Sequence, residues 1–570
     1  MARLNSDADR SFNESGFTIV ELLVVIVVIG ILAAISLVSY SGISKRAIEV
    51  SLRSDLSNAA TQLKMFNVEN GSYPATISTD CSASPTSTTN LCLKPSAGND
   101  YSRIPYVRPT RQSFTLTIAN GDLVFSISEN SSSIAVVPPV STSFISAWGG
   151  IKADRANSII QTGDSGYAIA GYTESYSAGA NNSDAFLAKY NSTGVLVWNK
   201  TWGGTSYDAA ESVIQTSDGG YVVVGSTASY AVAGTGGDTF ILKYDSIGDL
   251  VWSKTWGGAS SDHAYSVIQT DDDSYVVTGY ADISGAGNDV FLLKYDSTGN
   301  LIWNKTWGSA GSDGAMSLMS TSDGGYMIAG STNITDVSYG DTLLLKYDSN
   351  GSLVWNKTWG GATKSDNAKS VIQTNDGNYV VAGSTDNYSH GNSDMFLIKY
   401  DTTGAVIWSK VWGGTGYDYA YSVVQTNDGG YVVAGYGSSF GAGSYSLMVV
   451  KYNSSGDLEW NKTFSGSSWA FGASIVKTTD NGYAVAGWTN SYGAGSDDML
   501  FVKFRANGII NNCVSPMCQT PGLVVLNSLS PAISFGTPTT AILAEPTANV
   551  GSPSARITSP TTTSTVIVAP

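Results

Sequence analysis

The chain has 570 residues, with 62 glycines, 13% charged residues, only two histidines and a formal net charge of −16. Aromatic residues make up 11% of it, which excludes global disorder, because disordered chains lack the side chains that form a core. Two histidines leave no room for a histidine-rich zinc site. Residues 141–510 hold 19 basic and 34 acidic residues, so this segment repels phosphate and a nucleic-acid partner is disfavoured.

The first long apolar segment, residues 17–39, carries a single charge, Glu21. About 20 apolar residues cross a bilayer as a helix, so its length predicts a membrane segment. A carboxylate inside such a helix costs ~3 kcal/mol and usually has a partner, although a Glu near the end can also snorkel. Residues 1–16 contain three acids beside two arginines, which is a poor n-region for a secretory signal peptide.

The string GFTIVE at residues 16–21 resembles the processing site of type IV prepilins and pseudopilins. The resemblance implies that prepilin peptidase removes the leader, residues 1–16, by cutting between Gly16 and Phe17, and that the new N-terminus is methylated. Glu21 would then pair with the N-terminal amine of a neighbouring subunit, since an unpaired charge in an apolar filament core is costly. The partners implied are the peptidase, the membrane and other pilin or pseudopilin subunits. A single-pass membrane protein that later reaches the cell surface is the implied location.

The region after the membrane segment continues as a helix. Apolar residues keep helical spacing at Ile48, Leu52, Leu56, Ala60 and Leu63, which predicts one transmembrane and assembly helix over residues 17–68. The periodicity stops at the string ENGSYP, where Gly and Pro break a helix. The same stretch also looks like the one that follows the long helix of pilins.

Residues 69–141 are predicted to be a small pilin-like β head with a linker. Ser113–Ala119 and Asp122–Glu129 alternate apolar and polar residues around Asn120-Gly121, which predicts a β-hairpin. The four cysteines fall into two close pairs, neither of them CxxC and neither with a histidine nearby. In an exported protein this favours two disulfides, Cys81–Cys92 and Cys513–Cys518, over a metal or redox role.

Beyond residue 142 the sequence repeats at intervals of 51–54 residues. Each unit contains four apolar runs of 5–8 residues, rich in Val, Ile, Tyr and Phe and bounded by Gly, Asp, Asn and Ser. This period predicts an all-β propeller of seven blades over residues 142–512. One aromatic residue recurs in every unit and is expected to pack between blades: Trp148, Trp202, Trp256, Trp307, Trp359, Trp412 and Phe464.

The strand count predicts how the ring closes. The strand that bears the recurring aromatic is a stub in the last unit, at 509–512, whereas an extra copy, Phe144–Trp148, precedes the first unit. We therefore expect Phe144–Trp148 to supply the fourth strand of the seventh blade, which removes an exposed sheet edge.

The repeat text resembles the bacterial β-propeller repeat family of the SBBP type. The matching strings are DVFLLKYDSTGNLIW at 289–303 and DGGYVVAG at 428–435. The resemblance covers about 365 residues and implies little about activity, since propellers host many functions.

Most repeated polar residues are interpreted as architecture. The Asp-Gly-Gly turns and the string GDSG at 163–166 occupy one slot of the repeat, so hairpin chemistry explains them better than a nucleophile does. Asp271–Asp273, His263 and His390 are read as drifted repeat positions. Acids begin most third strands, where turn capping is favoured over calcium because no DxDxDG loop is present: Asp184, Asp238, Asp289, Asp341 and Asp394. No catalytic residue, metal or cofactor is predicted.

Residues 513–570 contain 8 of the 15 prolines with many Thr and Ser, which predicts an extended, mostly disordered spacer. The combined hypothesis is a minor pilin-like subunit, itself a substrate of prepilin peptidase, that displays the propeller for adhesion or for binding an extracellular glycan or protein. The bulk of the propeller favours a tip or sparse position. Two alternatives stay open: a type II secretion pseudopilin, and an envelope-anchored propeller enzyme acting on glycans. Against a sialidase, residues 141–510 contain only Arg155 and Arg505.

Overall fold

The structure is a computed structural model, and it divides the chain into two compact units, Met1–Val140 and Ser141–Pro570. The residues it describes are 50–74, 76–78, 90–96, 99, 107–110, 113–120, 123–128, 135–137, 143–510 apart from nine short gaps (180–181, 232–235, 283–286, 309–310, 334–339, 362–363, 442–443, 467 and 509), and 518–519, 549–551, 556–558 and 565–567.

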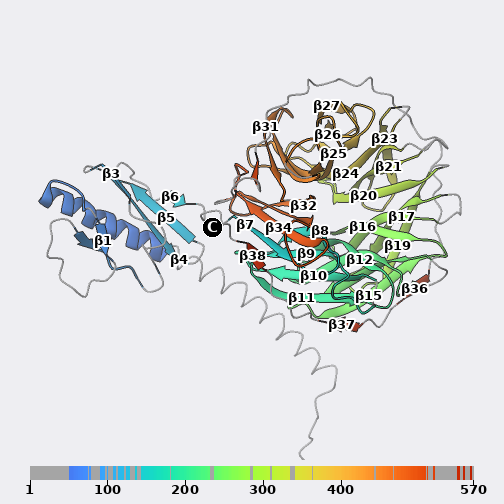
Figure 1. The fold of residues 1–570 in the computed structure, drawn as a ribbon, viewed down its shortest axis with the longest axis horizontal. Helices are drawn as coiled ribbons and strands as arrows, with labels where there is room; N and C mark the ends of the chain where they lie inside the picture. The colour runs from blue at the N-terminus through green and yellow to red at the C-terminus, as the bar shows by residue number, and fades with distance from the viewer. Residues whose placement is uncertain are drawn as a thin grey trace, which may run out of the picture. The chain divides into compact units, whose positions relative to one another are not determined.

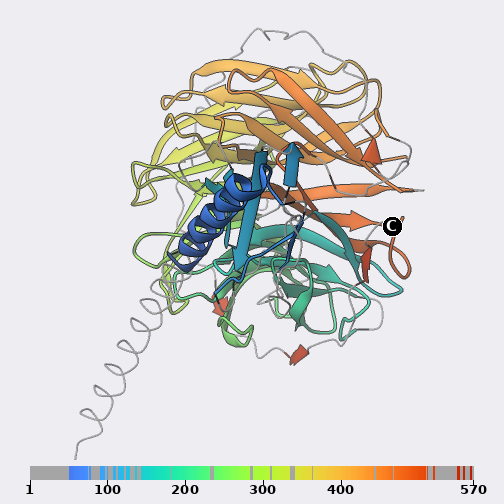
Figure 2. The same ribbon diagram turned by 90° about the vertical axis from the view of Figure 1, so that its left-hand side faces the viewer.

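The first unit pairs a helix with a small sheet (Figures 1 and 2). The helix covers residues 50–70, two residues beyond the predicted end, and Gly71 follows it with a φ of 69°. Leu52, Leu56 and Leu63 are buried at the predicted helical spacing, against Leu116 of the sheet and other apolar residues. The sheet has the order β3 (Val107–Thr110), β4 (Ser113–Asn120), β5 (Leu123–Ser128), β6 (Ala135–Val137), and β1 (Thr76–Ser78) pairs with β2 (Asn90–Cys92) separately.

The predicted hairpin of the head is confirmed, with a shift of its turn. β4 and β5 are antiparallel, and Asn120 pairs with Leu123. The two connecting residues are thus 121 and 122, one position later than the Asn120-Gly121 turn expected from the sequence. Asn120 therefore belongs to the ladder of β4 and β5 instead of to the turn.

The second unit confirms the seven-bladed propeller within the residues described (Figure 1). Each blade is an antiparallel sheet whose first strand is innermost and whose fourth is outermost. Blade 1 consists of β8 (Asp154–Gln161), β9 (Tyr167–Thr173), β10 (Asp184–Tyr190) and β11 (Leu196–Gly203). The strands of blades 2 to 6, in the same order, are β12 (Asp208–Gln215), β13 (Tyr221–Thr227), β14 (Asp238–Tyr244) and β15 (Leu250–Gly257); β16 (Asp262–Gln269), β17 (Tyr275–Ala281), β18 (Asp289–Tyr295) and β19 (Leu301–Trp307); β20 (Asp313–Ser320), β21 (Tyr326–Thr332), β22 (Asp341–Tyr347) and β23 (Leu353–Trp359); β24 (Asp366–Gln373), β25 (Tyr379–Thr385), β26 (Asp394–Tyr400) and β27 (Val406–Trp412); β28 (Asp418–Gln425), β29 (Tyr431–Gly437), β30 (Ser446–Tyr452) and β31 (Leu458–Phe464).

The ring closes as the strand count predicts. Blade 7 contains β32 (Ala470–Lys477), β33 (Tyr483–Thr489) and β34 (Asp498–Phe504), and its fourth strand is β7 (Phe144–Trp148). β7 is antiparallel to β34, with Met499 opposite Trp148 and Lys503 opposite Phe144. Residues more than 350 positions apart in the sequence therefore share one sheet, and this pairing closes the ring.

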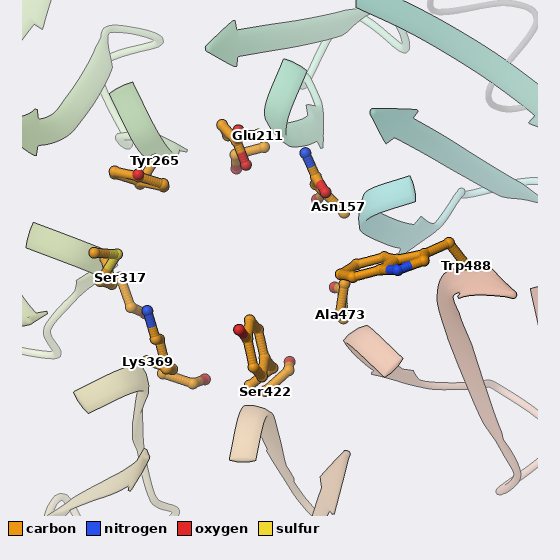
Figure 3. A pocket seen from close by; sticks show the side chains of 14 residues that line it. Asn157, Glu211, Tyr265, Ser317, Lys369, Ser422, Ala473 and Trp488 are labelled. Carbon is orange, nitrogen blue, oxygen red and sulfur yellow. The ribbon is translucent and has the colours of Figure 1, made fainter. Parts of the chain in front are cut away.

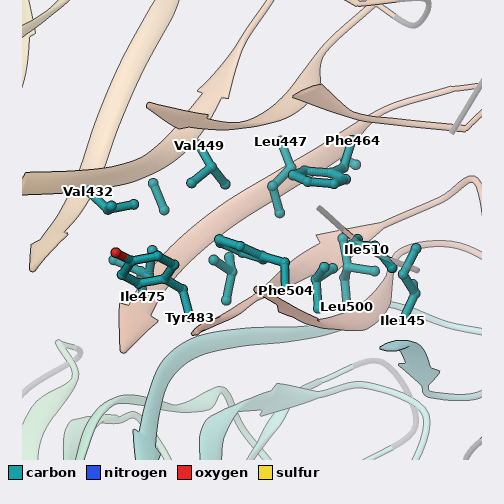
Figure 4. Packing of buried hydrophobic residues seen from close by; sticks show 14 residues of the cluster. Ile145, Val432, Leu447, Val449, Phe464, Ile475, Tyr483, Leu500, Phe504 and Ile510 are labelled. Atoms are coloured by element: carbon teal, nitrogen blue, oxygen red, sulfur yellow. The ribbon is translucent and has the colours of Figure 1, made fainter. Parts of the chain in front are cut away.

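The core of the propeller lies between neighbouring blades. Second and third strands such as β13 and β14 are almost entirely buried, since each of their faces packs against a different blade. Figure 4 shows one such cluster, in which Val432 and Leu447 of blade 6 meet Phe504 of blade 7 and Ile145 of β7. Burial on both faces explains why these strands read as continuous apolar runs.

The described part of the tail consists of four short strands, where the sequence predicts a mostly disordered spacer. Each is antiparallel to an outermost strand: β35 (Cys518–Gln519) to β31, β36 (Asn549–Gly551) to β15, β37 (Arg556–Thr558) to β11, and β38 (Thr565–Ile567) to β7. An outermost strand offers unpaired N–H and C=O groups, with which an extended Thr- and Val-containing segment can pair. Composition alone gave no sign of this pairing.

Candidate functional site

The residues predicted to direct processing and assembly, Gly16, Phe17 and Glu21, lie outside the described residues. Cys81 and Cys513 lie outside them as well. Among the residues that are described, no helix combines the length and apolarity needed to cross a bilayer. Cys92 is disulfide-bonded and Cys518 lies on β35, but the two predicted pairings stay predictions.

The seven recurring aromatics are buried between blades. Their exposed fractions are 5% or less, and each lies near the end of an outermost strand. Trp202 of blade 1, for example, packs against Tyr230 and Phe240 of blade 2, with ring centroids 5.0 and 4.8 Å away. Trp148 makes the same contacts with Tyr176 and Phe186 of blade 1 across the closure. These residues hold neighbouring blades together.

The Asp-Gly-Gly turns contain an ion pair that sequence reasoning missed. In each blade a lysine of the third strand, 12% exposed or less, reaches the aspartate of the turn between the first two strands at 2.6–3.0 Å. The available signal was a lysine that interrupts every third apolar run just before its last aromatic residue. Gly163–Gly166 is one of these turns, with Asp164 bound to Lys189, so the architectural interpretation of that string is confirmed. Asp272 fills the same position in blade 3.

Two of the five acids expected to cap turns, Asp184 and Asp394, do so, and Asp498 of blade 7 does the same. Asp184, Asp394 and Asp498 accept hydrogen bonds from backbone N–H groups four to six residues earlier. No group of three or more His, Cys, Asp or Glu residues able to hold a metal ion occurs among the described residues. These acids also face an acid of the next blade, which the sequence did not indicate.

The innermost strands line a cavity of about 230 Å³ at the centre of the ring (Figure 3). Each of these strands contains a β-bulge at its fourth residue: Ala210 pairs with Gly225 and Ser212 with Val224, which leaves Glu211 without an opposite residue. Gly225 makes the bulge possible, because a Cβ there would lie 1.9 Å from the carbonyl oxygen of Ala209. Bulges commonly redirect a side chain toward a site.

A serine after every bulge ties the innermost strands to one another. Its hydroxyl accepts a hydrogen bond from the backbone N–H of the next blade, as Ser158 does from Val213 at 3.2 Å. Six of the seven junctions show this bond at 3.2–3.3 Å. The serines therefore belong to the scaffold, and their hydroxyls accept from backbone N–H groups that face the channel.

The bulge residues themselves differ from blade to blade. All seven line the cavity together with Trp488 of β33. In blade order they are Asn157, Glu211, Tyr265, Met316, Lys369, Tyr421 and Ala473. In Figure 3 the labelled ones surround an open centre. The scaffold of the ring is uniform, whereas its lining is not.

Two charged side chains lie on opposite parts of this lining. Glu211 contacts the imidazole of His263 at 3.2 Å, and His263 itself does not line the cavity. The ammonium of Lys369 lies 5.6 Å from the ring centroid of Tyr421. Burial lowers the pKa of Lys369, and the negative charge of Glu211 opposes that shift. His390 lies elsewhere, where its backbone N–H caps Asp394.

Aromatic rings around the cavity are held by neighbours. Tyr265 stacks on His263 with centroids 4.5 Å apart, and Trp488 stacks on Phe471 at 5.0 Å. The guanidinium of Arg155 lies over Trp488 and pairs with Asp497. Arg155 is therefore engaged, and the described propeller offers no arginine cluster for a sialidase-type carboxylate site.

Comparison with known proteins identifies the N-terminal region. The prokaryotic N-terminal methylation motif, a protein family, matches residues 11–37. Type II secretion system core protein G of Pectobacterium carotovorum subsp. carotovorum is 32% identical over 72 residues, which is 13% of this chain and 46% of that protein. Regulatory protein FlaEY of Caulobacter vibrioides is 28% identical over 221 residues, 33% of this chain and 23% of that protein. The chain spans less than half the length of both relatives.

Solved structures resemble the chain only loosely. Sqt1 from Chaetomium thermophilum covers 63% of this chain and 100% of its own, with 9% identity and a TM-score of 0.38. A point mutant of the NanB sialidase from Streptococcus pneumoniae covers 71% and 85%, with 8% identity and a TM-score of 0.33. Such values carry no functional argument. The chain is thus a protein with a prepilin-type N-terminus followed by a seven-bladed β-propeller.

Proposed function

We propose that this protein is a minor subunit of a pilus or pseudopilus that displays its propeller outside the cell as a ligand-binding module. The prepilin-type motif over residues 11–37 carries the proposal, because a motif of this kind supports processing by prepilin peptidase. Cleavage after Gly16 would leave Glu21 near a free amine, the group that can neutralise it in an apolar filament. A propeller of about 365 residues on a small head favours a tip or sparse position.

The ligand-binding half of the proposal rests on the central cavity. Its lining places charged and amide side chains beside aromatic ones on a rigid scaffold, and such convergent polar groups can orient a small ligand. No arrangement of a nucleophile with a base is found there among the described residues. Binding is therefore preferred to catalysis, and the glycan-active enzyme is the weaker alternative.

The assembly half is tested by mass spectrometry of the protein purified from its own cells. A mature N-terminus at methylated Phe17 is expected, and Glu21→Val should be cleaved but excluded from sheared filaments. A protein that retains residues 1–16 would overturn the proposal. Immunogold labelling with an antibody to the propeller should give sparse or terminal label, whereas label along the whole shaft would contradict a minor subunit.

A type II secretion pseudopilin is the second candidate. The likeness to core protein G over 63–72 residues favours it. The two candidates differ in a measurable way: deleting a secretion pseudopilin stops export of the secreted enzymes, whereas deleting a surface-display subunit leaves export intact.

A further inference from the structure

We propose that the central cavity binds one neutral sugar residue at the end of a glycan chain, a proposal that rests on the ligand-binding role above. The site is built from the bulge residues of the innermost strands and from Trp488. Neither the N-terminal motif nor the relatives that share it bear on this part of the molecule.

The variation among the bulge residues is the first argument. Five of the seven innermost strands have Asp, Ala, Ser and Gln at their first, third, fifth and eighth positions, so the fold fixes those residues. The fourth position accepts Asn, Glu, Tyr, Met, Lys or Ala with the same backbone bulge, so the fold does not fix it. Two of these half-buried positions hold large aromatic side chains, Tyr265 and Tyr421, which the repeat itself does not require.

The aromatic rings are the second argument. Trp488 is held by the stacked ring of Phe471 and by Arg155, and Tyr421 lies 5.4 Å from Tyr436. These contacts fix the rings before a ligand arrives, which reduces the entropy lost on binding. The C–H face of a pyranose is apolar and flat, and an immobilised ring is the surface it packs against.

Hydrogen-bonding groups stand beside the rings. Glu211 uses one carboxylate oxygen for His263, and its other oxygen has no hydrogen-bond partner among the described residues. Asn157 donates its amide to the carbonyl oxygen of Ala210, which leaves its own oxygen as an acceptor. Within the described part of the propeller the ammonium of Lys369 has no hydrogen-bond or ion-pair partner. Two acceptors and a donor around an apolar platform match the hydroxyl groups of a sugar.

Charge and backbone geometry exclude other ligands. The cavity lining has one acid and one base, and residues 141–510 carry a net −15, so an anionic glycan or nucleic acid is repelled from the propeller. A peptide that bound by strand addition would need free backbone donors on the innermost strands. Next to the bulges these N–H groups already donate to the serine hydroxyls of the neighbouring blade.

The test uses the purified full chain in detergent and an array of neutral oligosaccharides ending in glucose, galactose, mannose, N-acetylglucosamine or N-acetylgalactosamine. Binding of at least one terminal sugar is expected, with an affinity, measured by calorimetry, that changes less than twofold between 50 and 500 mM NaCl. Glu211→Gln, which keeps the shape of the side chain, and Trp488→Ala should each weaken it tenfold or more. Trp488→Phe should retain part of it. Glu459→Gln, on the outermost strand β31, is the matched control and should bind as the native chain does.

Three results would overturn the proposal: no neutral sugar bound, binding indifferent to Glu211→Gln, or preferential binding of sialylated or sulfated glycans or of peptides. The N-terminal mass and filament incorporation are measured on other parts of the molecule. A failed glycan test with a correctly processed N-terminus would refute the sugar site and leave the assembly proposal standing.

Discussion

Asp498 of blade 7 and Asp154 of blade 1 face each other across the closure of the ring, with Gly149 between them. A Cβ on Gly149 would lie 2.1 Å from one oxygen of Asp498 and 2.7 Å from one of Asp154, so the two oxygens are less than about 5 Å apart. Asp154 is bound by Gly150 N–H and by the hydroxyl of Ser175. The facing oxygen of Asp498 has no hydrogen-bond partner among the described residues. Burial, with the charge of the facing Asp154, raises the pKa of Asp498 to about 6, and protonation of Asp498 removes the repulsion between the two carboxylates.

The same arrangement recurs at each of the five junctions from that of blades 1 and 2 to that of blades 5 and 6. Burial, and at each junction the charge of the facing acid, raise the pKa of one member to about 6 or 7: Asp184, Asp262, Asp289, Asp341, Asp394 and, at the closure, Asp498. The junction of blades 6 and 7 lacks the arrangement entirely. There Ser446, Ala470 and Ser465 replace the two acids and the glycine, so the three positions change together.

The acid pairs predict that the propeller is more stable at pH 5 than at pH 7.5. Their raised pKa values mean that the folded state holds protons that the unfolded chain has released above about pH 4. Stability therefore falls as the pH rises from about 4 to 7. One pKa unit corresponds to about 1.4 kcal/mol, so several pairs should lower the thermal midpoint by roughly 5–10 °C across that window. Differential scanning calorimetry measures it.

The aspartates in the turns between the first two strands of each blade limit the stability of the propeller at low pH. Their lysine partners and turn hydrogen bonds hold the pKa of Asp323 and Asp428 near 2, so stability is lost as the pH falls toward that value. The maximum should therefore lie near pH 4–5. Asp498→Asn should flatten the slope above it. A midpoint that does not change between pH 5 and 7.5, or one that added calcium alone raises at pH 7.5, would contradict protonation of one acid in each pair.

Two adjacent glycines provide a test of the packing around these acids. A Cβ on Gly257 would lie 2.5 Å from Asp238 and 2.6 Å from Asp262, whereas one on Gly258 meets nothing within 4 Å. Gly257→Ala should cost about 1–3 kcal/mol, as overpacking does, and Gly258→Ala should be nearly neutral. Urea unfolding of the two variants checks this. Equal midpoints would show that the carboxyl groups move aside freely.

The junction of blades 6 and 7 predicts how the clash is relieved. Gly257→Ser combined with Asp238→Ser and Asp262→Ala reproduces the residues that this junction already uses. We expect the triple variant to be more stable than Gly257→Ser alone, since the added Cβ then has no carboxylate to meet. The coupling free energy is the change in unfolding free energy of the triple variant minus the sum of the changes of the three single variants. Additive effects would argue against a unit of three residues.

The sequence predicted the blades and their closure because each depends on local pattern. Strands such as Tyr221–Thr227 have their own turn residues and apolar runs, and the stub at 509–512 left Phe144–Trp148 as the missing strand. The bulges could not be foreseen, since Glu211 in a strand looks like any alternating polar residue. The acid pairs join Asp498 to Asp154, two positions that only closure of the ring brings together.

The closing strand should dominate the stability of the ring. Deleting residues 142–149 removes Trp148 and Phe144 from the core between blades 7 and 1 and exposes the edge of β34. We expect the thermal midpoint to fall by more than 10 °C. Trp148→Ala should cost about 3–5 kcal/mol by itself. Val197→Ala, at a position 58% exposed on an outermost strand, is the control. A deletion variant with an unchanged midpoint would refute closure by this strand.

The lysine of blade 7 gives the sharpest test of the buried ion pairs. Lys503 is 1% exposed and Asp480 14%, and both carboxylate oxygens accept from the ammonium at 2.9 Å. Burial lowers the pKa of Lys503 although Asp480 opposes that shift, so desolvation outweighs the attraction. Asp480→Asn removes the carboxylate that faces this buried ammonium and should cost about 3–5 kcal/mol.

The paired change separates the ion pair from its burial cost. Lys503→Met with Asp480→Asn removes both charges and should recover most of the stability that Asp480→Asn alone loses, because no ammonium then remains unsolvated. Asp218→Asn is the comparison, since Asp218 is 61% exposed and Lys243 keeps Thr216 as a partner; it should cost about 1 kcal/mol. Urea denaturation of the native chain, Asp480→Asn, Lys503→Met and the double variant yields the coupling energy. If the double variant is no more stable than Asp480→Asn, burial of the lysine is not what makes the pair necessary.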